Sequence, residues 1–294
     1  MTTFVRIADA GSISKAAASL RLSVAMASRH LRALEDDLGV ELIRRTTRAL
    51  ALTEAGTEFL VRSRALLAGV SEARDVVRPG RGVAGVLSIS LPVSFGLAQV
   101  GPLFPALLAA HPRLKLDLRF EDRVIDLLGD GVDLAIRAGV QPPDSPFVIA
   151  RKLATVDRVL CASPAFLARS GRIASVAALA RLPCLIQGPA PTRWSFDTPE
   201  GPATVEVDGR VRTTNVIALR EAVLAGLGVA RLPSWIIEDD LRKKRVVRVL
   251  ETAAMPVIEI YGMFHAGSKG STAIHAVIDF LKAELPRRTK MSRA

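Results

Sequence analysis

The sequence predicts an α + α/β protein in which a helical N-terminal region precedes a larger α/β region. Residues 1–77 are rich in Ala, Leu and Arg and keep a helical periodicity almost throughout. From residue 86 onward, short β-rich runs alternate with helical runs, which indicates α/β structure. Between them, the proline and glycines of "RPGRGVAG" (78–85) interrupt both patterns and predict a hinge. The part after the hinge, roughly 210 residues, is long enough to form two lobes.

The composition is typical of a soluble protein with an excess of positive charge. The chain has 294 residues, of which 49% are hydrophobic, and its 40 Lys and Arg against 29 Asp and Glu give a net charge of +11. This charge favours a polyanionic partner without locating the site. No apolar run approaches the roughly 20 residues that span a bilayer, and Arg6, Asp9 and Lys15 interrupt any signal peptide. We therefore expect a cytoplasmic protein that does not bind membranes.

The sequence gives no sign of a metal or cofactor site. Cys161 and Cys184 match neither a CxxC pair nor a zinc ligand set, so we expect reduced, buried thiols. The four histidines, His30, His111, His265 and His275, lack metal-ligand spacing. "GRGVAG" (80–85) matches GxGxxG, but it follows a helix and opens a strand, the inverse of the dinucleotide-binding context. No nucleophile–base arrangement is visible either, so we expect no enzymatic activity.

The stretch "SVAMASRHLRALEDDLG" (23–39) predicts an amphipathic helix with a signal at each end. Ser23 is a typical N-cap, and Gly39 follows the last helical position as a C′ glycine. One face is apolar and predicts contact with a core: Val24, Ala27, Leu31, Leu34 and Leu38. The opposite face has short side chains that permit close approach and donors for phosphate or guanine: Ala25, Ser28, Arg29 and Arg32.

The charges of this helix run against its dipole, because Arg29 and Arg32 come early and the acids of 35–37 come late. Taken alone, the helix is more typical of a solvated surface helix than of a DNA reader. Its context favours the second interpretation. "SKAAASL" (14–20) predicts a short helix that Arg21 and Leu22 join to the longer one, and two helices with so tight a turn form a helix-turn-helix candidate.

A basic hairpin and a long helix follow. "VELIRRTTRALALTEAG" (40–56) predicts a β-hairpin wing whose turn carries Arg44, Arg45 and Arg48 around Thr47. Thr53 then caps a helix with a heptad seam of about three repeats, typical of a coiled-coil dimer with two DNA half-sites. The predicted dimerisation positions are Phe59, Ser63, Leu66, Val70, Ala73 and Val77.

These motifs resemble the LysR-type transcriptional regulators. "GSISKAAASLRLSVAMASRHLRALEDDLGVELIRRTTRALALTEAG" is similar to the winged helix-turn-helix of that family over nearly its whole length, and "LTEAG" (52–56) is a family hallmark. The resemblance implies that 23–38 is the recognition helix, that the 44–48 hairpin lies against phosphate or the minor groove, and that the helix from Glu54 is a dimerisation linker. The implied DNA-binding residues are Ser23, Val24, Ala25, Ser28, Arg29, Arg32, Arg44, Arg45, Thr47 and Arg48.

The sequence departs from the family pattern at three places. It begins at "MTTFVRIADAGS", several residues after the usual start of the first helix, so we expect either a shortened first helix or a start farther upstream. Arg21 occupies a turn position where the family often has Gly, so it must adopt the backbone that the turn needs. Val24 stands where Gln or Pro is common. It cannot donate a hydrogen bond to a base but can contact a thymine methyl, which affects the operator sequence.

The α/β region predicts a largely parallel sheet with helices between the strands. We expect strands at 86–91, 114–120, 132–137, 158–162, 229–232 and 257–264, and helices at 97–110, 124–128, 216–225 and 272–285.

Three strand ends in this region lead into helices. The first strand ends at Pro92 and leads through Ser94 into a helix. Thr214 or Asn215 caps a second helix, which begins near Val216. Leu232-Pro233 closes another strand. Such ends are standard sites for small polar or anionic ligands. The three ends either face one cleft between two lobes or are ordinary capped turns.

The resemblance to the LysR family extends over this region. "GVLSISLPVSFG", "HPRLKLDL", "GVDLAIRAG", "EAVLAGLGVARLP" and "HAVIDFLKAEL" are similar to its effector-binding domain, which has the fold of type 2 periplasmic binding proteins. Arg137 either holds an effector carboxylate or, as we favour, pairs with Glu121 or Asp122. The predicted effector-binding residues are Pro92, Ser94, Phe95, Arg137, Ala138, Gln187, Thr214, Asn215, Leu232 and Pro233.

These predictions divide the chain into five parts: a winged helix-turn-helix DNA-binding domain (1–53), a coiled-coil dimerisation helix (54–78), a hinge (79–84), an effector-binding domain of two α/β lobes (85–286) and a basic tail (287–294). The expected partners are double-stranded DNA, a small-molecule effector with a carboxylate as candidate, further copies of the chain as a dimer or tetramer, and RNA polymerase as a candidate. The alternative is a solute-binding module or enzyme whose N-terminal helices serve only oligomerisation.

Overall fold

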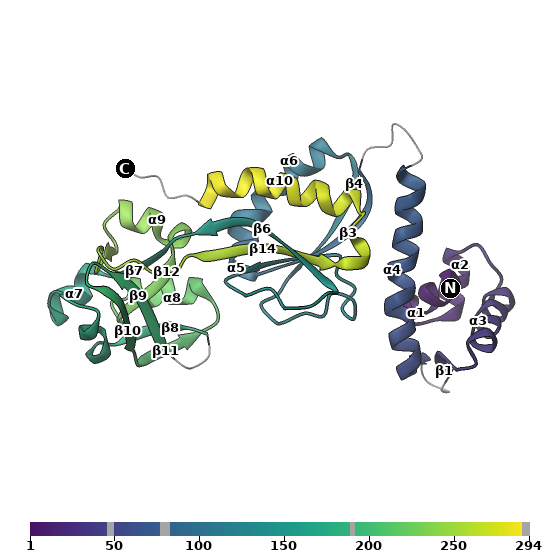
Figure 1. Ribbon diagram of the computed structural model, residues 1–294, viewed down its shortest axis with the longest axis horizontal. Coiled ribbons are helices and arrows are strands. Elements are labelled where there is room, and N and C mark those ends of the chain that lie inside the picture. Colours follow the sequence, from purple (N-terminus) through teal and green to yellow (C-terminus); the bar gives the residue numbers. More distant parts are fainter. Residues whose placement is uncertain (46–49, 77–82, 189–191, 290–294) are drawn as a thin grey trace.

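The computed structural model has three parts along its length: an N-terminal domain, a long helix and a two-lobed α/β region (Figure 1). It describes residues 1–45, 50–76, 83–188 and 192–289. The predicted hinge lies mostly outside these ranges, and the first strand of the α/β region already begins at Ala84.

The N-terminal domain contains three helices followed by a hairpin: α1 (Thr2–Ala10), α2 (Ile13–Ser19), α3 (Val24–Leu38), β1 (Ile43–Arg45) and β2 (Leu50–Leu52). Gly11, in the left-handed region at φ 59°, ends α1, and Ser12 caps α2 by accepting the Lys15 N–H. The apolar faces of these elements meet in one small core, formed mainly by Phe4, Ile7, Ala16, Leu31 and Leu42. The helix-turn-helix and wing predicted from the sequence are therefore present.

The turn between α2 and α3 has the backbone for which the family often uses glycine. Arg21 lies in the left-handed region at φ 56°, which costs a residue with a Cβ about 1 to 2 kcal/mol. The Leu22 N–H donates to the Ala17 carbonyl oxygen over 2.9 Å and closes the turn. Closure of this turn and the packing of α2 on α3 offset the strain.

Helix α4 (Glu54–Val76) begins directly under the wing. The Thr53 hydroxyl accepts the Gly56 N–H at 2.8 Å and donates to the Glu41 carbonyl at 2.7 Å, which confirms the predicted cap. A Cβ on Gly56 would lie 1.9 Å from the Leu42 carbonyl oxygen. Glycine at this position of "LTEAG" is therefore required by the close approach of α4 to the wing.

Lobe I is a five-stranded mixed sheet covered by helices, in the order β4-β3-β5-β14-β6. Its strands are β3 (Ala84–Leu91), β4 (Arg113–Phe120), β5 (Leu134–Ala138), β6 (Val148–Val156) and β14 (Ile258–His265). Figure 1 shows α10 (Thr272–Thr289) lying along this sheet beside α6 (Phe104–Ala110). The short helix η4 (Ala266–Ser268) leads from β14 toward α10.

The helical stretch 93–110 is long and apolar enough by composition to cross a membrane, with a mean hydropathy of 1.6. It consists of α5 (Val93–Phe95), the π-helical η1 (Gly96–Val100), the 3₁₀-helical η2 (Gly101–Leu103) and α6. Its apolar side chains include Phe95, Val100, Phe104 and Leu107, which are buried in the core of lobe I. In this structure the stretch is a core helix of lobe I.

Lobe II repeats the arrangement with a five-stranded sheet in the order β11-β8-β12-β7-β13 and a separate hairpin β9–β10. Its strands are β7 (Arg158–Ala162), β8 (Cys184–Gln187), β9 (Arg193–Thr198), β10 (Gly201–Glu206), β11 (Gly209–Thr213), β12 (Val229–Pro233) and β13 (Val247–Arg248). Its helices are α7 (Pro164–Ser170), η3 (Ala177–Arg181), α8 (Val216–Leu224) and α9 (Ser234–Arg242).

The prediction of a largely parallel sheet is wrong for half of each sheet. In lobe I, β3 is parallel to β4 and β5, whereas β14 is antiparallel to β5 and β6. In lobe II, β8 is parallel to β11 and β12, whereas β7 is antiparallel to β12 and β13. The chain crosses between the lobes twice, and β7 and β14, the strands that follow these crossings, each enter their sheet in the reversed direction.

Two of the predicted helix limits are also wrong. Residues 124–128 are not helical: 124–126 are irregular and 127–128 belong to a turn, because the Asp130 carboxylate accepts from the Arg123 guanidinium at 2.9 Å and from the Asp126 N–H at 3.0 Å. Helix α10 runs through Pro286 to Thr289, so the first residues of the predicted basic tail are helical. Thr289 is buried. Its hydroxyl lies 2.9 Å from the Leu285 carbonyl within α10 and 3.4 Å from the Thr155 carbonyl of β6, and the second contact joins this last turn to lobe I.

Both cysteines are buried free thiols, as predicted. Burial raises the pKa of Cys161 and of Cys184 to about 12, so both thiols stay protonated at neutral pH. Protonated, enclosed thiols are poor nucleophiles, which indicates a packing role.

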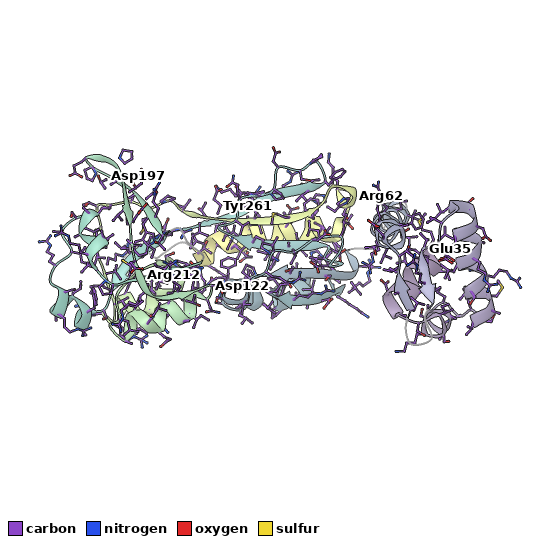
Figure 2. All side chains as sticks on the ribbon, turned by 90° about the horizontal axis from the view of Figure 1, so that it is seen from below. Glu35, Arg62, Asp122, Asp197, Arg212 and Tyr261 are labelled. Atoms are coloured by element: carbon purple, nitrogen blue, oxygen red, sulfur yellow. The ribbon has the colours of Figure 1, made fainter. Side chains whose placement is uncertain are left out.

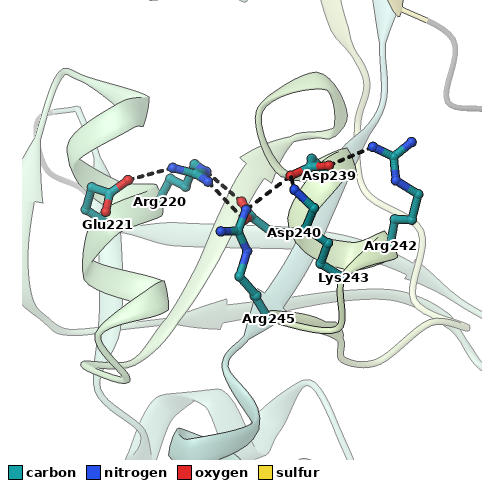
Figure 3. A network of polar contacts seen from close by, with 7 residues as sticks. All are labelled: Arg220, Glu221, Asp239, Asp240, Arg242, Lys243 and Arg245. Atoms are coloured by element: carbon teal, nitrogen blue, oxygen red, sulfur yellow. Dashed lines mark hydrogen bonds and ion pairs between the residues drawn. The ribbon is translucent and has the colours of Figure 1, made fainter.

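An ion-pair network joins α8 to α9 in lobe II (Figure 3). The buried Asp240 carboxylate accepts from Arg220 at 2.5 and 2.9 Å and pairs with Arg245 at 2.5 Å. Its neighbour Asp239 pairs with Arg242 and Lys243 at the exposed side of the same network. Arg220 also pairs with Glu221 and Arg245 with Asp239, so removing the Asp240 carboxylate would break the least exposed ion pairs of the network and leave both arginines only partly compensated.

We predict that Asp240→Asn lowers the free energy of unfolding by about 2 kcal/mol, discounted because both arginines are partly exposed to solvent. The matched control is Asp239→Asn, for which we expect a much smaller loss because that pair is exposed. Urea unfolding followed by circular dichroism measures both. Equal losses of unfolding free energy in the two variants would show that burial of Asp240 adds nothing to the stability of the fold.

Candidate DNA interface and effector cleft

The outer face of α3 presents exposed donors near its N-terminus. The Ser23 hydroxyl accepts the Met26 N–H at 3.2 Å and caps the helix as predicted. Arg29 and Arg32 are exposed, and neither has an ion-pair partner among the described residues. Ala25 is exposed and Ser28 half-buried on the same side. This face therefore combines small side chains with two available guanidinium groups.

The predicted core face of α3 is correct at its centre and wrong at both ends. Ala27 and Leu31 are buried and Leu34 is half-buried, but Val24 is 49% exposed and Leu38 39% exposed. Helices α1 and α2 cover only the middle of α3. The neighbouring Met26 is also exposed, so the tip of the recognition helix is apolar rather than hydrogen-bonding.

The acidic end of α3 has a structural role that the sequence did not reveal. Glu35 Oε1 accepts the N–H groups of Leu42 and Ile43 at 2.8 and 3.1 Å. Glu35 is labelled within the N-terminal domain in Figure 2. The carboxylate thus fixes the start of the wing relative to the recognition helix, which accounts for an acid placed against the helix dipole.

The wing itself is only partly described. Arg44 is exposed on β1. The side chain of Arg45, together with Thr47 and Arg48, lies outside the described residues. Their assignment to DNA remains a prediction.

The predicted seam of α4 divides into two parts. Phe59 packs on Phe4 with ring centroids 5.6 Å apart, and Ser63 is fully buried, so these two positions belong to the N-terminal core and not to an outer face. The ion pair of Arg64 with Asp9 holds α4 on α1 there. Leu66 and Val70 are 58% and 49% exposed. The side chain of Ala73, and Val77, lie outside the described residues.

A cavity of about 510 Å³ lies between the two lobes. Most of the predicted effector-binding residues line it: Pro92, Ser94, Phe95, Ala138, Gln187, Thr214 and Pro233. Asn215 stands beside it as the cap of α8, where its Oδ1 accepts the Ile217 N–H at 2.9 Å and the Ser94 hydroxyl at 3.4 Å. The three strand ends identified in the sequence therefore do converge on one cleft.

Two of the predicted cleft residues lie elsewhere. Leu232 is fully buried in the core of lobe II, because alternation along β12 turns it away from the face that carries Pro233. Arg137 is 7% exposed and lines a separate cavity of about 470 Å³ in lobe I. It pairs directly with neither predicted acid: its guanidinium donates to the Ser90 hydroxyl at 2.9 Å, and that hydroxyl donates to Glu121 at 2.9 Å.

Two arginines on the cleft wall, Arg158 and Arg231, were not predicted. Arg158 is opposite Pro233 in the β7–β12 ladder, and Arg231 is two positions before Pro233, so all three share one face of the sheet. Burial lowers the pKa of both arginines, that of Arg231 to about 10 with the charge of Arg158 as a further cause. Side chains alternate between the two faces of β12, so the alternation that turns Leu232 away from the cleft also predicts that Arg231 faces the cleft.

Contacts between the lobes border the cleft. Besides the Ser94–Asn215 hydrogen bond, the rings of Phe95 and Trp235 meet edge to face with centroids 6.1 Å apart. Asp122, labelled near the junction of the lobes in Figure 2, is the one acidic residue on the cleft wall within the described ranges. It accepts the Val93 N–H at 3.1 Å. Within those ranges, no group of His, Cys, Asp and Glu side chains is arranged to hold a metal ion.

Comparison with known proteins agrees with this two-part architecture. Residues 1–57 match the family described as bacterial regulatory helix-turn-helix protein, lysR family, and residues 80–286 match the LysR substrate binding domain. The chain belongs to the LysR family of transcriptional regulators, which bind DNA through the helix-turn-helix and a small effector through the second domain. The N-terminal helices therefore do not serve oligomerisation alone.

Individual relatives extend over almost the whole chain. The transcriptional regulator DmlR of Escherichia coli is 32% identical over 96% of this chain and 92% of its own length, and PtxR of Pseudomonas aeruginosa is 31% identical over 97% and 91%. Among solved structures, CrgA of Neisseria meningitidis is 26% identical, with a TM-score of 0.62 and coverage of 97% of both chains. The full-length Vibrio cholerae activator AphB is 25% identical, with a TM-score of 0.61.

We predict that Glu35→Ala loosens the wing. The N–H groups of Leu42 and Ile43 would lose their acceptor, which costs about 1 to 3 kcal/mol locally. Hydrogen exchange at these two amides should then accelerate on the order of 10-fold to 100-fold. Asp36→Ala, one residue farther along α3 and exposed, is the control and should leave both rates unchanged. Unchanged exchange in Glu35→Ala would mean that its carboxylate does not fix the wing.

Proposed function

We propose that the outer face of α3 reads the operator, with Arg29 and Arg32 as the donors to bases and phosphates and the wing arginines Arg44, Arg45 and Arg48 as phosphate contacts. The observation that carries this assignment is the pair of exposed guanidinium groups on α3, the second helix of the helix-turn-helix, without a carboxylate partner among the described residues. Val24, exposed at the tip, would contact a thymine methyl.

The cleft between the lobes is the proposed effector site. Its walls come from both lobes, so a ligand bound there would favour one lobe orientation over another. Through helix α4, that change would alter the arrangement of the DNA-binding domains in an oligomer. We propose that the protein acts in the cytoplasm by binding DNA and an effector and by regulating transcription, and that it catalyses no reaction. RNA polymerase is a candidate partner at the promoter.

Dimerisation is proposed through the outer surface of α4. Leu66 and Val70 are one helical turn apart and exposed, although both are large apolar side chains. A second copy of α4 packed on this surface would remove them from water and place two recognition helices on a two-fold related operator.

A gel shift with the DNA that flanks the gene tests the DNA interface. We expect salt-dependent binding by the native chain, and a loss of about 10-fold to 100-fold in affinity for Arg29→Ala and for Arg32→Ala, since one bidentate base contact contributes about 1 to 3 kcal/mol. Arg29→Ala should also reduce the preference for operator over random DNA. The control is Arg210→Ala, an exposed arginine on β11 of lobe II. Binding that is unaffected by the α3 substitutions would refute this interface.

The variant Leu66→Asp/Val70→Asp tests the oligomer. Two charges facing each other across the two-fold axis should shift sedimentation toward the monomer and weaken binding to a full operator more than to a half-site. The control is Arg210→Asp, on the exposed part of β11 in lobe II, away from α4. An unchanged sedimentation coefficient in the double variant would place the interface elsewhere.

A further inference from the structure

The cleft wall carries two positive side chains on neighbouring strands. Arg158 belongs to β7 and Arg231 to β12, and their register places them diagonally on one face of the sheet. Diagonal neighbours in an antiparallel pair are about 7 to 8 Å apart. Both side chains are half-buried and both line the 510 Å³ cavity. They therefore present two separate positive groups to one enclosed volume.

This arrangement has no internal counter-charge. Within the described residues, neither Arg158 nor Arg231 forms an ion pair with a carboxylate. Asp122, the acid on the same wall, accepts the Val93 N–H, and the remaining polar lining includes the neutral Gln187 and Thr214. Burial lowers the pKa of Arg231 to about 10, and the like charge of Arg158 is the second cause. An anion bound in the cleft would stabilise the positive charges of Arg158 and Arg231.

The two guanidinium groups are also positioned by their surroundings. The Arg231 guanidinium lies 4.7 Å from the centroid of the Trp194 ring, a cation–π contact with a buried indole. Arg158 lies beside Gly139 of lobe I: a Cβ there would be 3.7 Å from an Arg158 nitrogen. Arg158 follows β6 of lobe I after the single residue Asp157, so it stands where the chain passes between the lobes.

We propose that the effector is a short-chain dicarboxylate, with one carboxylate held by Arg158 and the other by Arg231. This inference rests on the proposed effector role of the cleft and names its ligand class. Two separate cations favour two separate anionic groups, and guanidinium binds carboxylate with paired, charge-assisted hydrogen bonds. Because Arg158 adjoins lobe I at Gly139, a ligand bound to it would contact both lobes and bias their orientation.

Thermal unfolding of the full chain with malonate, succinate or glutarate tests the proposal. The comparison ligands are butyrate, neutral succinamide and inorganic sulfate, all at matched ionic strength. We expect at least one dicarboxylate to raise Tm in a concentration-dependent manner, and the comparison ligands to leave it unchanged. Titration calorimetry should then give a Kd that rises about 10-fold to 100-fold in Arg158→Gln and in Arg231→Gln.

Arg210→Gln, on an exposed part of β11, is the matched control and should bind the dicarboxylate as the native chain does. Circular dichroism and operator binding without ligand establish that the cleft variants are folded. The proposal is overturned if no dicarboxylate raises Tm, if butyrate, succinamide or sulfate is as effective, or if both cleft variants bind with unchanged Kd. Salt-dependent operator binding would persist in each of these cases, so failure of the dicarboxylate assignment is distinguishable from failure of the DNA-binding function.

Discussion

The shared topology of the two lobes is the constraint on which the cleft depends. Strand β14, which follows the whole of lobe II in the chain, lies between β5 and β6 in the lobe I sheet. Lobe I therefore cannot complete its sheet until the chain has passed through lobe II and returned. The first crossing is a single residue between β6 and β7, which places the start of β7 beside lobe I. The two crossings therefore connect the lobes on either side of the cleft and place Arg158 on its wall.

Much of the fold follows from local sequence signals. The caps at Ser23, Thr53 and Asn215 were visible because each is a short polar residue before an apolar periodic run, and each caps its helix in the structure. The six strands predicted in the α/β region lie within two residues of their observed limits, and β7 matches its limits. Strands β6, β8, β9, β10, β11 and β13 were missed, because their positions are fixed by neighbours distant in sequence.

The errors have more than one physical origin. The 124–128 run has helical spacing, but local hydrogen bonds of Asp130 with Arg123 and Asp126 hold it in a non-helical conformation. Pro286 normally ends a helix, yet burial of Leu285 and Thr289 carries α10 past it. The cleft residues were predicted from strand ends and from the family resemblance, without applying the alternation of β12 to separate Leu232 from Arg231. Spacing along the chain located the cleft but did not identify its charges.

Leu42 is the meeting point of the three elements of the DNA-binding domain. Its N–H is held by Glu35 of the recognition helix, and its carbonyl oxygen accepts the Thr53 N–H at 3.0 Å and closely faces Gly56 of α4. Helix α3, the wing and α4 are thereby joined at one residue. A displacement of α4 would therefore move α3 and the wing together, so their position relative to each other would be preserved.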